Sequence, residues 1–227
     1  VRSRGLGDVY KRQFLNQVLQ IKQINELLLV FKFLNSCGPE LRQKLLKPYT
    51  KPDFCIDMLV SGAWLSEHKA STIEPSSHSN IFAQLEEFAK LWGQTDLAVC
   101  CIKYRAIIID EYGGDKKQAL AILEKGLKLY GETNSELVRA KAKVLYRAED
   151  YKSSLKLSKA LIDGDAPLSE IEKAFLGRDA AISAEKQGDH KTARCYYFYG
   201  SNAAKNCSIP DMGPMHVGLM ADAALAS

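Results

Sequence analysis

Three short turn signals recur along the second half of the chain and constrain its fold more than any other feature. Gly114-Asp115, Glu149-Asp150 and Gly188-Asp189 lie 35 and 39 residues apart, and each separates two stretches of helical periodicity. A period of this length is typical of a helix pair that repeats along a chain. The sequence therefore predicts an all-α protein built from antiparallel helix pairs.

Small residues lie at fixed distances from each turn, where two connected helices must approach closely. The position four residues after each aspartate holds Ala119, Ser154 or Ala193. The position eight residues before the aspartate is mostly small and holds Ile107, Ala142 or Ala181. The position ten or eleven residues after it holds Gly126, Ala160 or Gly200. Because each pair leaves an apolar face that only the next pair can cover, we expect the pairs to stack.

Helix boundaries can be placed from caps and breakers. Residues 99–109 are rich enough in Ile, Val and Cys for a buried strand, but the length of the uninterrupted run favours a helix. Ser169 and Glu172 form a capping-box pattern. The expected helices are 96–112, 115–130, 135–148, 151–162, 169–188 and 189–205, and 215–227 is expected to be the start of a further, truncated helix.

The region 14–92 is also expected to be helical, either as diverged repeats or as a different helical unit. Its expected elements are an amphipathic helix over 14–31, a short helix from Pro39, a helix near 53–64, a polar loop over 71–80 and a helix over 81–92.

Residues 1–13 resemble a translated sequencing-adapter scar, because the chain lacks a starting methionine and contains Asp8-Val9-Tyr10-Lys11-Arg12-Gln13. We therefore expect the natural N-terminus to be missing. These residues carry four basic side chains and one acidic side chain, so without them the formal net charge falls from +4 to +1. The charge then gives no support to a nucleic-acid partner.

No pattern for catalysis or metal binding is present. The chain lacks P-loop, dinucleotide-binding, nucleophile-elbow and zinc-protease motifs. The four histidines are far apart, and the six cysteines contain no CxxC pair. We therefore expect a protein that is not an enzyme and that has no metal or cofactor. Apolar runs of about five residues exclude a membrane-spanning segment, and we expect a cytoplasmic location.

A basic stripe is the most distinctive surface pattern. Arg139, Lys143 and Arg147 are four residues apart and share one helix face, with Tyr146 beside them. Such a stripe suits an acidic partner, or it is a solvated helix face.

The turn, the small residue after it and the near-34-residue spacing resemble the tetratricopeptide repeat family over residues 96–205. The family's Trp-Leu-Gly-Tyr pattern is missing, and the proline at the repeat end is replaced by Gly131 and Asp163-Gly164. The resemblance implies a right-handed superhelix (an α-solenoid) that is a non-catalytic scaffold. Its repeats would cover 96–130, 134–163 and 168–205.

In that family, the first helix of each pair lines a concave groove that receives a peptide or a helix. Aligned on the turn aspartates, the resemblance assigns to this groove Tyr104, Ile108, Tyr112, Glu136, Arg139, Lys143, Tyr146, Arg147, Arg178, Ile182 and Lys186. Basic and aromatic walls suit an acidic segment or a C-terminal carboxylate. The family's carboxylate-binding asparagine is absent from these positions, which argues against a chaperone-tail pocket.

These features predict a protein or peptide partner, and neither nucleic acid nor membrane. An alternative is that the chain is a truncated piece of a larger signalling NTPase or other multidomain regulator, in which it is the C-terminal sensor or regulatory arm.

Overall fold

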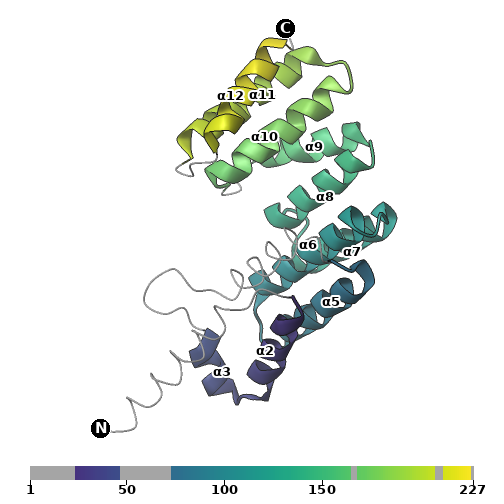
Figure 1. Ribbon diagram of the computed structural model, residues 1–227, viewed down its shortest axis with the longest axis vertical. Coiled ribbons are helices and arrows are strands. Elements are labelled where there is room, and N and C mark those ends of the chain that lie inside the picture. Colours follow the sequence, from purple (N-terminus) through teal and green to yellow (C-terminus); the bar gives the residue numbers. More distant parts are fainter. Residues whose placement is uncertain (1–23, 47–72, 165–167, 208–211, 226–227) are drawn as a thin grey trace, which may run out of the picture. The chain divides into compact units, whose positions relative to one another are not determined.

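The computed structural model describes residues 24–46, 73–164, 168–207 and 212–225, and the regular structure of these residues is entirely helical (Figure 1). The chain divides into two compact units, 1–115 and 116–227. The first contains α2 (Ile24–Ser36), α3 (Pro39–Leu46), α5 (Pro75–Leu91) and α6 (Thr95–Glu111). The second contains α7 (Lys116–Tyr130), α8 (Ser135–Arg147), α9 (Tyr151–Ile162), α10 (Glu170–Glu185), α11 (His190–Asn206) and α12 (Met212–Leu225).

The prediction of an all-α fold is confirmed for the described residues. Residues 99–109 lie within α6, which confirms the predicted helix over the strand. The short helix expected from Pro39 forms as α3. The capping box also forms: Ser169 Oγ accepts the backbone N–H of Glu172 at 3.3 Å, and Glu172 Oε2 accepts that of Ser169 at 2.9 Å. The adapter-like residues and the helix expected near 53–64 lie outside the described residues.

Two expected boundaries are wrong. α5 begins at Pro75, inside the stretch expected to be a polar loop. Glu74 caps this helix by accepting the backbone N–H groups of Ser76 and Ser77 at 3.3 and 2.6 Å, and proline suits the first helical position. α12 begins at Met212 because a proline in the first turn, here Pro214, does not interrupt a helix.

The first unit has a core in which α2 packs on α5 and α5 packs on α6. Leu27, Phe31 and Leu34 are the buried side chains of α2. The ring of Phe31 stacks on that of Trp92 with centroids 5.2 Å apart. Between α5 and α6, Arg105 Nη1 lies 3.7 Å from the carboxylate of the buried Glu86. The first unit is therefore held by apolar and aromatic packing, with a partly exposed ion pair between α5 and α6.

The residue before the aspartate has a left-handed backbone in all three turns. Gly114, Glu149 and Gly188 have φ values of +63° to +77°, in the left-handed region that favours glycine. The backbone N–H of the next residue, Asp150 or Asp189, donates to a carbonyl five residues earlier at 3.0 Å in both turns. Each of these two side chains also accepts the backbone N–H three residues further on, at 3.1 and 3.0 Å. The last two turns therefore share one geometry, whereas in the first the backbone N–H of Asp115 donates to the carbonyl of Ile109, six residues earlier, at 3.1 Å.

The small residues of the second repeat bring α8 and α9 together. Ser154 and Ala142, on opposite sides of the turn, are both buried, and Ser154 Oγ donates to the carbonyl of Ala142 at 2.9 Å. Ala160, which the pattern also places at a close contact, is exposed instead. Its small size is therefore not explained by packing.

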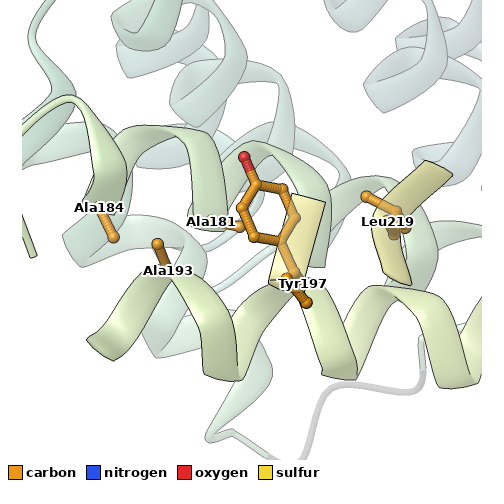
Figure 2. Packing of buried hydrophobic residues seen from close by; sticks show 6 residues of the cluster. Ala181, Ala184, Ala193, Tyr197 and Leu219 are labelled. Carbon is orange, nitrogen blue, oxygen red and sulfur yellow. The ribbon is translucent and has the colours of Figure 1, made fainter. Parts of the chain in front are cut away.

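The small residues of the third repeat give an even closer approach. Ala181 and Ala184 of α10 pack with Ala193 of α11 in a fully buried cluster (Figure 2). Further along the same pair, a Cβ atom built on Gly177 would lie 2.7 Å from the Cα atom of Gly200. Only glycines fit this crossing, so the helices pack backbone to backbone.

Candidate interaction surface

The first helices of two successive pairs, α8 and α10, are in contact within the second unit. Arg139 Nη1 of α8 lies 2.9 Å from Glu172 Oε1 of α10, and both residues lie in the N-terminal halves of their helices. Arg139 Nη2 lies 3.3 Å from Glu136 Oε1 of its own helix. Arg139 therefore joins the two helices through ion pairs with Glu136 and Glu172. We use the name α8/α10 surface for the predicted groove residues of these two helices: Glu136, Arg139, Lys143, Tyr146, Arg147, Arg178, Ile182 and Lys186.

The remaining predicted residues of α8 differ in exposure. Lys143 is exposed, whereas Tyr146 and Arg147 are half-buried. The ring of Tyr146 meets that of Tyr151 edge-on, with centroids 5.7 Å apart. The backbone carbonyl of Arg147 accepts a hydrogen bond from the side chain of Lys116. Lys143 is thus the residue of this group that presents the most side chain to a partner.

The predicted residues of α10 also divide into packed and exposed. The guanidinium of Arg178 bonds the carboxylate of Asp179 at 2.8 Å and lies 5.1 Å from the ring centroid of Phe175. Ile182 is half-buried against the alanine cluster that joins α10 to α11. Lys186 caps the C-terminus of α10 and is exposed.

The three predicted residues of α6 belong to the first unit. Ile108 has no exposed surface, and Tyr104 is only 8% exposed because its ring packs 5.8 Å from that of Phe82. Tyr112 caps α6 and is half-buried. A partner therefore cannot touch Ile108 in this conformation, and the α8/α10 surface is defined by residues of the second unit alone.

The α8/α10 surface carries charges of both signs. Arg139 and Arg178, two of the predicted cations, each pair with a carboxylate that the sequence pattern did not assign to the surface. The glutamate that pairs with Arg139 lies on the neighbouring helix, so no spacing within α8 could reveal it. The surface is therefore less basic than the stripe in the sequence predicts, and its charge favours an acidic partner less strongly.

A buried phenol lies near the C-terminal end of α10. Tyr197 Oη of α11 donates to Glu185 Oε2 at 2.8 Å, and the tyrosine is 3% exposed. Burial, followed by this hydrogen bond and the charge of Glu185, raises the pKa of Tyr197 far above its ordinary value; Asp222 and Tyr146 act in the same direction. The phenol therefore stays neutral and acts as a hydrogen-bond donor that joins α11 to α10.

The described residues contain no group of three or more His, Cys, Asp or Glu side chains that could hold a metal ion. Among the described helices, none has the length and apolar character needed to cross a membrane. Comparison of the chain with models of protein families and with curated proteins gives no match.

Proposed function

We propose that the chain is a non-catalytic protein-interaction module of the tetratricopeptide-repeat type, whose pairs stack as a right-handed superhelix. Its α8/α10 surface receives a peptide or a helix of another protein. The observation that carries this proposal is the repetition of one geometry: two successive helix pairs share the same left-handed turn and aspartate cap, and their first helices are in contact. Repeated pairs of this kind form extended surfaces for partners.

The chemistry of the partner follows from the exposed side chains. Lys143 and Lys186 are exposed cations, and Arg139 and Arg178 pair with carboxylates. Half-buried Tyr146 and Ile182 add apolar contact area between the charges. A segment with a few acidic side chains and an apolar anchor fits this surface better than a uniformly acidic one.

Affinity capture from a lysate tests the proposal with a matched pair of variants. Lys143→Glu combined with Lys186→Glu reverses two charges on the α8/α10 surface. Lys152→Glu combined with Lys156→Glu reverses two exposed charges on α9. Arg139 is left intact because its ion pairs contribute to the contact between α8 and α10.

We expect a protein that is captured by the parent and by the α9 variant but lost with the α8/α10 variant, while circular dichroism shows equal helicity for all three. Equal loss with both variants would indicate nonspecific attraction between charges and would contradict the proposed surface. Capture of nothing would favour the alternative of a regulatory arm whose partner is another part of its own protein.

A further inference from the structure

The second helices of the three pairs, α7, α9 and α11, are far more basic than the other helices of the second unit. α7 carries four lysines, and α9 and α11 carry three Lys or Arg side chains each. Their single carboxylate, Glu124, pairs with Lys141 of α8 at 3.0 Å. The other helices, α8, α10 and α12, carry six cations and six carboxylates. The formal net charge of +1 outside residues 1–13 hides this separation, because it sums over all helices.

The cations of the second helices lie on the side that faces solvent. A lysine follows each turn aspartate by two residues, and all three of these lysines are exposed: Lys117, Lys152 and Lys191. Each precedes the buried small residue of its helix by two positions. At 100° per residue, it therefore lies about 160° around the helix from that buried residue. The repeat thus places a lysine opposite the packed face of each second helix.

α9 continues this pattern along its whole length. Lys152, Lys156 and Lys159 are exposed and recur at steps of four and three residues, about 6 and 4.5 Å apart along the helix axis. The helix contains no acidic residue and packs on α8 and α10 through its opposite, buried side. Its exposed side is therefore a stripe of positive charge that points away from the α8/α10 contact.

α11 adds an aromatic ring to the same kind of stripe. It contains no acidic residue, and its exposed cations are Lys191, Arg194 and Lys205. The guanidinium of Arg194 lies 5.8 Å from the ring centroid of Phe198, which is 36% exposed. A ligand at this stripe can therefore meet both cations and an accessible ring.

These exposed cations have no carboxylate partners of their own. We use the name second-helix face for Lys117, Lys125, Lys128, Lys152, Lys156, Lys159, Lys191, Arg194 and Lys205. None of them forms a salt bridge with a carboxylate of the described residues. Lys152 and Lys191 interact electrostatically with the turn aspartates Asp150 and Asp189, which also accept backbone N–H groups. Most of the positive charge of the face is thus open to a ligand.

We infer that the second-helix face binds the phosphate backbone of a single-stranded nucleic acid. Rows of cations along one side of a protein attract phosphates, and a flexible strand can follow such cations from one helix to the next. The exposed ring of Phe198 suits a stacked base. An anionic membrane fits less well, because α9 exposes no large apolar side chain that could enter a bilayer. Contacts to phosphates do not depend on the base sequence.

This face is separate from the α8/α10 surface, and the inference goes beyond the proposed function. Its ligand is not a protein, so charge reversal on α9 still serves as the control for protein capture.

Fluorescence anisotropy of a labelled strand of about twenty uridines, titrated with the full chain at about 50 mM salt, tests the inference. Lys152→Gln combined with Lys156→Gln removes two charges from the second-helix face. Lys143→Gln combined with Lys186→Gln removes two exposed charges from the α8/α10 surface and gives the same net charge. Glutamine is a good helix former, and circular dichroism checks that helicity is unchanged. All three proteins keep the basic residues 1–13, so those residues cannot cause a difference.

We expect the parent to bind with a micromolar dissociation constant that rises with salt. One phosphate contact contributes about eightfold in affinity at this salt, so the α9 variant should bind at least tenfold more weakly and the α8/α10 variant within threefold of the parent. A parent that does not bind at about 100 µM would overturn the inference. Equal weakening by both variants would overturn it as well, because only net charge would then matter. Preferential binding to vesicles that contain phosphatidylserine would identify a membrane as the ligand instead.

Discussion

The hydroxyl of Ser154 on α9 donates a hydrogen bond to the backbone carbonyl of Ala142 on α8, at 2.9 Å, across the turn that joins the two helices. Ser154 lies four residues after the turn aspartate, Asp150, and Ala142 lies eight residues before it. Their contact explains why the sequence repeats small residues at these two distances. The same two positions in the next pair are Ala193 and Ala181, which pack together without a hydrogen bond.

Two buried serines on α9 should respond oppositely to loss of the hydroxyl. Ser154→Ala removes the hydrogen bond to α8, and we expect it to lower the free energy of unfolding by about 1 kcal/mol. Ser158 is fully buried and its Oγ atom has no hydrogen-bond partner among the described residues, so Ser158→Ala should leave stability unchanged or raise it. Urea denaturation of the two variants checks this, and a larger loss from Ser158→Ala would contradict the packing of α9.

A large side chain should destabilise the protein at the buried position 193 but not at the exposed position 160. Ala193 is fully buried against α10, so Ala193→Trp should lower the free energy of unfolding by about 3 kcal/mol. Ala160→Trp, at an exposed position of α9, should change it little. Thermal and urea unfolding measure both. Equal stability of the two variants would mean that α10 and α11 do not pack as described.

Glycine in place of Glu149, in the turn between α8 and α9, should stabilise the fold. Glu149 has φ +63°, whereas the equivalent positions in the other two turns are Gly114 and Gly188. Glu149→Gly should raise the free energy of unfolding by about 0.5–1 kcal/mol, because it relieves the left-handed backbone despite the entropy cost of glycine. Glu149→Ala keeps the strain and is the control in the same urea titration; an equal gain from alanine would contradict the explanation.

The two aspartate caps should make the fold sensitive to acid. Hydrogen bonds from Ser153 lower the pKa of Asp150, and hydrogen bonds from Thr192 lower that of Asp189. Because both pKa values are lower in the folded state, the stabilisation is complete above the unfolded value near 3.9 and is lost as the pH falls through the folded values.

Asn is also a good cap but does not titrate, so the double variant Asp150→Asn/Asp189→Asn should lose less stability than the parent between pH 5 and pH 3. Urea midpoints across this range provide the measurement. Parallel curves for the two proteins would show that other groups cause the acid sensitivity.

The ion pair between α8 and α10 should make Arg139 a structural residue. Arg139→Glu would place a third carboxylate beside Glu136 and Glu172 and should lower the free energy of unfolding by about 1 kcal/mol. Glu172→Arg added to that variant should restore part of the loss. Lys156→Glu, on the exposed side of α9, is the matched charge reversal and should have little effect.

The helices of the second unit were predictable because their signals are local. A turn with Gly or Glu before Asp, a capping box at Ser169 and apolar periodicity each act within a few residues. The sequence pattern does not predict the start of α5, because the serines after Pro75 are typical of loops. What makes it helical is the carboxylate of Glu74, a less common cap.

The surface was less predictable because its members depend on tertiary contacts. The spacing of Arg139, Lys143 and Arg147 correctly places them on one helix, but it cannot show that Glu172 of α10 pairs with the first of them. Burial of Ile108 likewise depends on helices that pack around α6 and not on its position within the repeat.

Site-specific photo-crosslinking in a lysate tests the proposed interaction surface most directly. A photoreactive amino acid at position 143 lies on the α8/α10 surface, and one at position 156 lies on the exposed side of α9. If α8 and α10 receive a partner, position 143 should form a discrete adduct with another protein and position 156 should not. Adducts of the same protein in equal yield from both positions, or from position 156 alone, would contradict the account.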